Sequence, residues 1–304
     1  PVGYDWTSDD AFTETAGFTM NMPESGDMKV LLLSDLHISF FFNDKTFKFI
    51  DKMIKRTDPN LIVLMGDNVG YLWNHKSCAQ FIKRIDSYKI PWAPIIGNHD
   101  GSGKANRNYI AKMLSDATAN SVYCMFNYGP NSLEKFSGNY FVNLKNGGDI
   151  AHTLYMISSG KQSGEGTHYP RIPELQTKWL EWAQEGNGYL PSSIFTHIPL
   201  KEFDLAWQSG EHLFGERHEK VYGPDDTADF FASAKSGGTK NIFAAHDHYN
   251  NYSVMYQGVQ LTYTLHSSFS RVSYEYWGFK KIIRGGTMLT IKPDGTTTQE
   301  HIYA

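Results

Sequence analysis

The stretch KVLLLSDLH, residues 29–37, decides the fold. Its apolar residues form a short continuous run, which is typical of a strand covered on both faces of a sheet. The run ends in Asp35 and His37, two polar side chains that follow the expected strand directly. We therefore expect a buried strand with polar residues at its carboxyl end.

The same pattern occurs twice more in the first hundred residues. Residues 61–68, LIVLMGDN, and residues 92–100, WAPIIGNHD, are further apolar runs that end in polar side chains. Between the three runs, residues 46–56 and 78–89 carry apolar side chains at helical spacing, which predicts two amphipathic helices.

Asp35, Asp67 and Asn98 each follow one of these runs, and they are spaced 32 and 31 residues apart. This interval is the length of one strand–helix–strand unit. Parallel strands joined in this way end at one edge of the sheet, and ligands of open α/β sheets bind along that edge. A turn after the third strand can use Gly97 and Asn98 but has no need of His99, so we expect a functional site there.

Two later apolar runs, residues 193–197 (SIFTH) and 241–248 (NIFAAHDH), also end in histidines. Residue patterns predict further strands at 140–144, 153–157, 193–196, 241–245, 254–263 and 288–291, and helices at 173–185 and 228–236. Residues 158–173 and 201–226 are expected to form long loops, which are uncommon unless they are functional or mobile.

Eight polar side chains from these strand ends form a candidate metal site: Asp35, His37, Asp67, Asn98, His99, His197, His246 and His248. Carboxylates, an amide and imidazoles are ligands for borderline divalent ions such as manganese, iron and zinc. Residues two apart, as in the pairs 35/37 and 246/248, point the same way from an extended backbone. We expect Asp67 to bridge two metal ions, and ions ~3.5–4 Å apart suit phosphoryl chemistry because they stabilise the attacking and leaving oxygens together.

In chain order the residues form five motifs: Asp35-Leu36-His37, Gly66-Asp67, Gly97-Asn98-His99-Asp100, a lone His197 and His246-Asp247-His248. This series resembles that of the calcineurin-like metallophosphoesterase family. Residues 168–183, HYPRIPELQTKWLEWA, are similar to the branch that contains purple-acid-phosphatase-like and Dcr2-like phosphatases. The resemblance implies an α/β fold with two stacked mixed β-sheets flanked by helices, a four-layer α/β/β/α sandwich. It places residues 29–304 in one domain, with residues 1–28 as an N-terminal extension that packs on this body.

The resemblance also implies a role for each motif residue. Asp35, His37 and His248 would hold the first metal ion, and Asn98, His197 and His246 the second, with Asp67 shared between them. A metal-bound hydroxide would attack phosphorus in line. His99, a non-ligand in the family, would be catalytic by stabilising the transition state or protonating the leaving oxygen. Asp100 would support the catalytic group from beside it.

The chain departs from the family pattern in two places. Ala245 stands where the family usually has glycine, and alanine fits if its φ is negative. His37 is present, whereas purple acid phosphatases lack that histidine and use a metal-binding tyrosine soon after Gly-Asp. Tyr71 lies one position too far along for that role, so we expect a colourless enzyme.

Four residues are predicted to contact the substrate: His168, Arg217, His218 and Arg271. Arginine can pair with phosphate, although either arginine can equally be structural. His212 and His266 also lie in irregular segments and are further candidates for substrate contact. The substrate is expected to be a small-molecule or protein phosphoester, with a phosphomonoester favoured. The alternatives are a phosphodiesterase acting on nucleotide or phospholipid-type diesters and, more weakly, a non-catalytic metal-binding scaffold.

Composition limits the partners and the compartment. The chain has 304 residues, 40% of them hydrophobic, and a net charge of -4, which favours neither nucleic acid nor an anionic membrane as a partner. No apolar segment is long enough to cross a bilayer. Cys78 and Cys124 allow one disulfide but no cysteine zinc site. Pro1 as the first residue indicates processing, and the content of Tyr, Asn, Gly and Trp favours an exported protein, periplasmic or secreted. The oligomeric state and the metal identity are left open.

Overall fold

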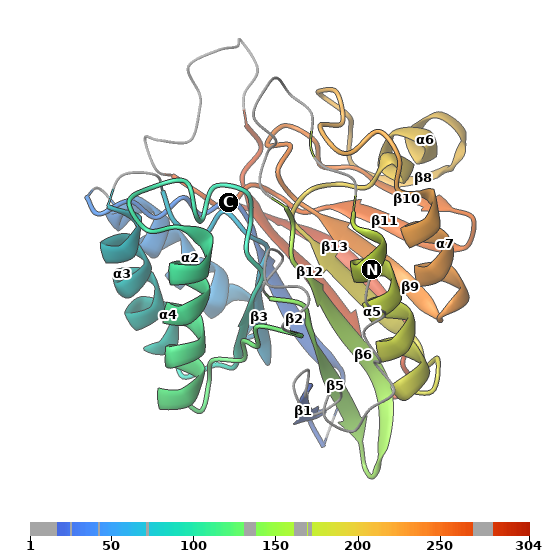
Figure 1. Ribbon diagram of the computed structural model, residues 1–304, viewed down its shortest axis with the longest axis horizontal. Coiled ribbons are helices and arrows are strands. Elements are labelled where there is room, and N and C mark those ends of the chain that lie inside the picture. Colours follow the sequence, from blue (N-terminus) through green and yellow to red (C-terminus); the bar gives the residue numbers. More distant parts are fainter. Residues whose placement is uncertain are drawn as a thin grey trace.

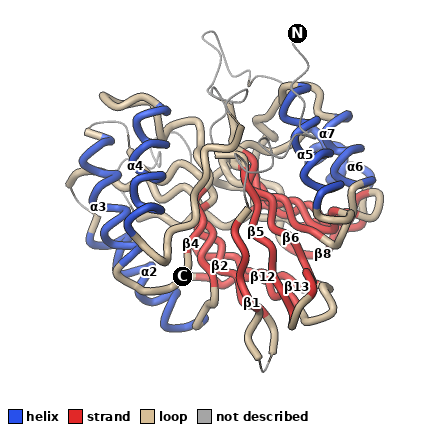
Figure 2. The backbone as a smooth tube through the Cα atoms, turned by 60° about the horizontal axis from the view of Figure 1, so that its bottom comes forward, coloured by secondary structure: helices blue, strands red, loops and turns tan. Residues whose placement is uncertain are grey.

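The computed structural model describes residues 17–24, 26–41, 43–70, 73–130, 138–160, 169, 172–269 and 282–304. Two mixed β-sheets lie together in the middle of the molecule, and helices cover the outer side of each (Figure 1). Figure 2 shows the strands in red between two sets of helices in blue. The predicted sandwich of two mixed sheets flanked by helices is confirmed.

The smaller sheet contains β2 (Met28–Leu33), β3 (Leu61–Leu64), β4 (Trp92–Pro94), β12 (Gly285–Ile291) and β13 (Thr297–Tyr303). The strand order is β13-β12-β2-β3-β4. Strands β2, β3 and β4 are parallel, as predicted, and β12 and β13 add antiparallel pairs beyond β2. The carboxyl ends of the three parallel strands therefore meet at one edge of the sheet.

The larger sheet contains β1 (Phe18–Asn21), β5 (Tyr140–Asn146), β6 (Asp149–Ile157), β7 (Ser192–Thr196), β8 (Glu211–Phe214), β9 (Thr239–Ala244), β10 (Ser253–Tyr256) and β11 (Val259–Tyr263). The strand order is β1-β5-β6-β7-β9-β11-β10-β8. Strands β6, β7, β9 and β11 are parallel to one another, so the ends of β7 and β9 also share an edge.

Two sets of helices cover the sheets. The first set is α2 (Asp44–Thr57), α3 (Asn74–Asp86) and α4 (Arg107–Asn120), and the second is α5 (Glu174–Gly186), α6 (Lys201–Ser209) and α7 (Ala228–Ser236). In β5 the side chains alternate between two cores: Val142 and Leu144 join the core of the smaller sheet and α2–α4, and Phe141 joins the core under α5–α7. This period of two is what a strand between two apolar layers requires.

Two of the expected segments are wrong, and others were not expected. Residues 201–226 are not one long loop, because α6 and β8 lie within them. The single closing strand expected at 254–263 is a hairpin of β10 and β11, whose turn residues Gln257 and Gly258 both have positive φ. Helix α4 and strands β1 and β13 were not predicted.

Three further findings bear on the expectations from sequence. Strand β1 pairs in parallel with β5, so part of the predicted N-terminal extension belongs to the larger sheet, while the domain boundary itself stays a prediction. Cys78 and Cys124 are buried free thiols, and burial raises the pKa of Cys124 to about 12, as expected for an unreactive cysteine. None of the helices in the described ranges has the length and apolar character of a membrane span.

Candidate metal centre

The predicted ligands lie on five loops, which follow β2, β3, β4, β7 and β9. Main-chain hydrogen bonds hold the first two loops together, since the amide of Asp35 donates to the carbonyl of Gly66 (3.2 Å) and that of His37 to the carbonyl of Asp67 (2.8 Å). The amide of His246 donates to the carboxylate of Asp35 at 3.4 Å, which links the two sheets at their shared edge.

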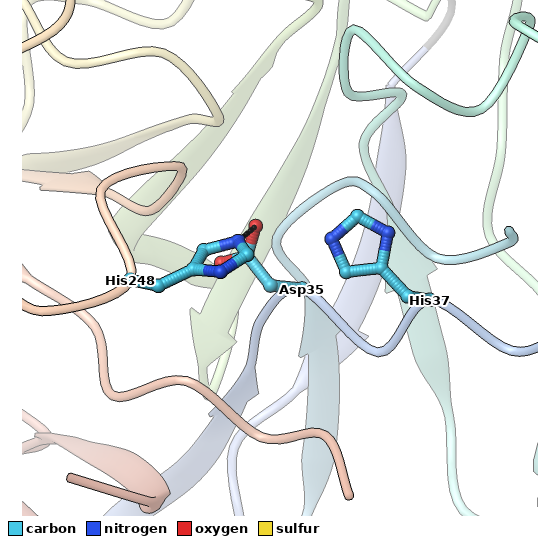
Figure 3. Close-up of side chains that lie close together, drawn as sticks. All are labelled: Asp35, His37 and His248. Carbon is cyan, nitrogen blue, oxygen red and sulfur yellow. Dashed lines mark ion pairs between the residues drawn. The ribbon is translucent and has the colours of Figure 1, made fainter. Parts of the chain in front are cut away.

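Asp35, His37 and His248 form a first group of possible metal ligands. One ligand atom from each residue lies within 4.8 Å of those of the other two. Asp35 and His37 come from the loop after β2, and His248 reaches them from the loop after β9 (Figure 3). Asp35 Oδ1 lies 3.3 Å from His248 Nε2, the contact dashed in that figure.

Asp67, His197 and His246 form a second group of the same kind. Asp67 Oδ2 lies 3.2 Å from His197 Nε2. The other ring nitrogen of His197, Nδ1, lies 2.8 Å from the carbonyl of Met65. A carbonyl only accepts, so Nδ1 carries the hydrogen and the lone pair of the neutral ring lies on Nε2, directed to the group. This arrangement is typical of a metal-binding histidine.

The carboxylate of Asp67 lies between the two groups. Its Oδ1 accepts a hydrogen bond from the amide of His99 (2.8 Å), which fixes the side chain. Its Oδ2 lies 3.8 Å from His37 Nε2 in the first group and 3.2 Å from His197 Nε2 in the second. One oxygen within reach of both groups is the arrangement that a bridging carboxylate needs.

Several buried polar atoms of these residues have no hydrogen-bond partner within the described part of the chain: Asp35 Oδ1, both ring nitrogens of His37, Asp67 Oδ2, both amide atoms of Asn98, and His197 Nε2. An unsatisfied buried polar group destabilises a protein by about 1–3 kcal/mol, so native structures avoid such clusters unless a ligand satisfies them. The converging oxygen and nitrogen atoms match the ligand preference of manganese, iron and zinc. The residues therefore fit a pair of metal ions.

The carboxylates and imidazoles of the two groups shift one another's pKa values. Burial would raise the pKa of Asp35 and Asp67, but the neighbouring histidines outweigh it and hold both values well below the usual range. Burial lowers the pKa of His37 to about 4 and that of His246 to about 3, so both are neutral at pH 7. Burial also opposes the charged form of His197, but Asp67 and Asp35 outweigh it and raise its pKa to about 9.

His99 is more accessible than His37 and His248 of the first group. Its side chain is 26% exposed, against 16% for His248 and 4% for His37, and its Nε2 lies 4.0 Å from Asp67 Oδ2. Burial lowers its pKa, so the ring is neutral at pH 7 and keeps one N–H donor. A partly exposed donor beside both groups is well placed to meet a substrate.

Asp100 is turned away from the two groups. Its Oδ1 accepts from the amide of Val69 (2.9 Å) and its Oδ2 from the amide of Gly97 (2.8 Å). The carboxylate thus joins the loop after β3 to the loop after β4. This geometry suits a residue that positions ligands and not one that touches substrate.

Arg107, the first residue of α4, holds the same turn from the other side. Its guanidinium donates to the carbonyls of Gly97 (3.0 Å) and Ile96 (3.2 Å) and contacts the hydroxyl of Ser158. Burial lowers its pKa to about 10, so it stays charged at neutral pH. This residue was not predicted from the sequence, because no local pattern distinguishes it from a surface arginine.

The backbone at the ligands is not extended. Asp35, His37, Asp67 and His246 have φ values of 53°, 43°, 50° and 70°, in the left-handed region that non-glycine residues seldom adopt. The expectation that the pairs 35/37 and 246/248 point inward from an extended backbone is therefore wrong, because tight turns present them instead. Such strain clusters at functional sites. Ala245 is not among the positive-φ residues, so alanine fits there as expected.

Two of the four predicted substrate contacts, His168 and Arg271, lie outside the described residues, as does Tyr71. Arg217 is engaged with helix α6 and with its own loop: Nη2 lies 2.8 Å from the carboxylate of Asp204 in α6, and Nε donates to the carbonyl of Glu219 (3.1 Å). The structure thus places its guanidinium in a local ion pair.

His218 lies on a cavity of about 590 Å³ with Tyr249, the residue after His248, and with Phe269 and Arg284. This position is compatible with the predicted substrate contact. His212, in contrast, stacks on Trp207 at a ring distance of 4.2 Å in the exposed strand β8.

Comparison with known proteins agrees with this geometry. Residues 28–250 match the sequence model of the calcineurin-like phosphoesterase family. The chain is 28% identical to "Probable inactive purple acid phosphatase 14" of Arabidopsis thaliana, over 78% of this chain and 70% of that protein. It is 26% identical to phosphatase DCR2 of Saccharomyces cerevisiae, over 79% of this chain but only 47% of that protein.

Two solved structures show the same fold. A dimetal phosphatase from Danio rerio superposes with a TM-score of 0.58 at 10% identity, covering 91% of this chain and 98% of that one. The purple acid phosphatase PPD1 from yellow lupin seeds gives a TM-score of 0.52 at 15% identity, covering 92% of this chain and 52% of that one.

Proposed function

Because the chain belongs to the calcineurin-like phosphoesterase family, and is thus a hydrolase of phosphate esters, we propose that it acts on phosphomonoesters at a dinuclear metal centre. The single observation that carries the dinuclear centre is the pair of ligand groups with the carboxylate of Asp67 within reach of both. Relatives named as phosphatases, DCR2 among them, support the preference for monoesters.

In this proposal the first group, Asp35, His37 and His248, would hold one manganese, iron or zinc ion. His197 and His246 of the second group would hold the other ion together with Asn98, and Asp67 would be shared between the two ions. A pair of divalent ions, when bound, polarises phosphoryl oxygens and lowers the pKa of water. The proposed ligands are nitrogen and oxygen atoms and include no thiolate, which is consistent with manganese, iron or zinc.

The remaining residues position the metal ligands and contact the substrate. Asp67 Oδ1 accepts a hydrogen bond from the main-chain amide of His99, so the proposed bridging residue also fixes the backbone from which the His99 ring extends. His99, whose ring is neutral at pH 7, donates a hydrogen bond from its N–H to a phosphoryl oxygen. Asp100 and Arg107 keep the turn of Asn98 rigid through the main-chain groups of Gly97.

Two other functions compete with this one. A phosphodiesterase would use the same metal centre, so ligand geometry does not separate it from a phosphatase. A metal-binding scaffold is suggested by the word "inactive" in the name of the Arabidopsis relative. Against the scaffold, all seven predicted ligands are present in this chain, and six of them, all except Asn98, form the two groups of neighbouring ligand atoms.

Paired hydrolysis of para-nitrophenyl phosphate and bis-para-nitrophenyl phosphate tests the proposal. The protein would be stripped with a chelator, reloaded with Mn²⁺, Fe²⁺ or Zn²⁺, and compared with Asn98→Ala and a surface control, Asn146→Ala. We expect faster monoester turnover that needs metal, is lost in Asn98→Ala and is kept in Asn146→Ala. Faster diester turnover would move the assignment to a phosphodiesterase, and metal-loaded protein inactive on both substrates would favour the scaffold.

A further inference from the structure

His266 lies beside the first ligand group but belongs to none of the five motifs. It follows β11, and its backbone is bridged to Ser34 at the end of β2 and to Arg284 at the start of β12. Its carbonyl accepts from the amide of Gly285 at 3.1 Å. The backbone of His266 is thereby fixed next to Asp35, which follows Ser34 directly.

The ring of His266 packs on the ring of His248. The two ring centroids are 4.4 Å apart and the planes are tilted by 38°. His248 is in turn 3.3 Å from Asp35 through Nε2. A side chain packed on one face of His248 limits the directions in which that ring can turn, so it helps to set where Nε2 points.

The burial of His266 needs an explanation beyond packing. The residue is 2% exposed, and neither ring nitrogen has a hydrogen-bond partner among the residues that the structure describes. A phenylalanine would fill the same space without burying two polar atoms, each of which destabilises the fold when unsatisfied. Unpartnered buried atoms of the same kind occur in Asp35, His37 and His197, the residues of the metal centre.

Asp35, His37 and His248 each offer a ligand atom within 4.8 Å of the others, and His266 is not part of this group. We therefore treat His266 as a neighbour of the ligands and not as a ligand. We propose that His266 is a positioning residue of the first metal group: its ring orients His248, and one of its ring nitrogens would hydrogen-bond to a water molecule that accompanies the metal ion. This inference rests on the proposed metal centre and adds a residue to it.

His266→Phe separates this role from a structural one. Phenylalanine keeps a ring against His248 and removes two nitrogens that have no hydrogen-bond partner among the described residues. The melting temperature of the metal-free variant should therefore equal or exceed that of wild type. Its affinity for one of two Mn²⁺ equivalents, measured by equilibrium dialysis with metal analysis, should fall about 10–100-fold, as for other residues that support metal ligands.

Three other variants complete the design. His266→Ala removes the ring as well, and should lower both metal-free melting and Mn²⁺ affinity. His37→Ala, which deletes a proposed ligand, should lose one equivalent outright. His212→Ala, which deletes an exposed stacked histidine, should bind both equivalents like wild type.

Two results would overturn the inference. One is wild-type affinity for both Mn²⁺ equivalents in His266→Phe. The other is an equal fall in the melting temperatures of the metal-free and metal-loaded His266→Phe protein, since a merely structural residue would act on both alike. If the wild-type protein bound two equivalents but hydrolysed no phosphate ester, the proposed function would fail while the role of His266 stood.

Discussion

Asp67→Asn is the substitution with the most direct consequence, because asparagine has the same shape as aspartate and lacks the charge. The carbonyl oxygen of the substituted side chain can still accept the amide of His99, which Asp67 Oδ1 accepts now at 2.8 Å. The amide nitrogen of the substituted side chain then replaces Oδ2, which lies 3.2 Å from His197 Nε2 and 3.8 Å from His37 Nε2. A hydrogen-bond donor would point at the place where both groups need an acceptor.

The loss can be estimated from the shortest of these distances. A unit charge 3.2 Å from Asp67 Oδ2 interacts with it by about 5 kcal/mol at an effective dielectric constant of about 20. For a divalent ion at this distance the lost attraction is roughly twice as large, and solvation of the altered site by water offsets part of the loss. A net loss of at least about 4 kcal/mol corresponds to about a thousandfold weaker binding, since about 1.4 kcal/mol is a factor of ten.

The assay is metal content after reconstitution with Mn²⁺ and dialysis, combined with hydrolysis of para-nitrophenyl phosphate. Wild type should retain two equivalents, and Asp67→Asn fewer than one, with activity at least about a thousandfold lower. The matched control is Asp116→Asn, a half-exposed carboxylate that pairs with Lys112 on the surface at 2.8 Å and should change neither measurement. Retention of two tightly bound equivalents by Asp67→Asn would refute the bridging role.

Three other perturbations probe the same structure. His99→Ala should keep two metal equivalents and lower turnover by about 10²–10⁴-fold, and loss of metal instead would make His99 a ligand. Arg107→Met removes the guanidinium that donates to two buried carbonyls, so it should lower the free energy of unfolding by about 2–4 kcal/mol in urea titrations. An unchanged free energy of unfolding would show that the turn is stable without Arg107. Burial lowers the pKa of His152 from 6.5 to about 4, so the unfolded chain binds a proton at this residue more readily than the folded chain does. The free energy of unfolding should therefore decline by about 3 kcal/mol as the pH falls from 6.5 to 4. His152→Gln should flatten that pH dependence in denaturation measured at pH 7.5 and 5, and parallel curves for variant and wild type would contradict it.

The strands around the site could be predicted because their signals are local. Each of β2, β3, β4, β7 and β9 is a short apolar run, and the ligands follow the runs within a few residues. Since chain order and strand ends were enough to collect the ligands, no tertiary contact had to be known. The same reasoning missed α4, where only Ile110, Ala111 and Leu114 are buried, because so few apolar residues give a weak helical pattern. It also missed β13, a half-exposed edge strand with the sequence TTQEHIY.

What the sequence could not supply are contacts between residues far apart in the chain. His266 is 18 residues from His248 and 231 from Asp35, and only the pairing of Ser34 with His266 brings it to the first group. Arg107 and Asp100 likewise act on main-chain groups, which no side-chain pattern reveals. The backbone at Asp35 and His37 is left-handed, and this conformation replaces the extended geometry that residue spacing alone favoured.

The division of ligands between the two sheets has an electrostatic consequence. The smaller sheet supplies Asp35 and Asp67, whose pKa values are held low, so its edge carries two buried negative charges. The larger sheet supplies His197 and His248, and Asp67 and Asp35 outweigh burial to raise the pKa of both. In the metal-free chain these imidazoles can therefore carry the protons that balance the carboxylates and hold the two edges together. Metal ions need the same nitrogens unprotonated, so metal binding must displace protons, and metal affinity must rise with pH until His197 has titrated near pH 9.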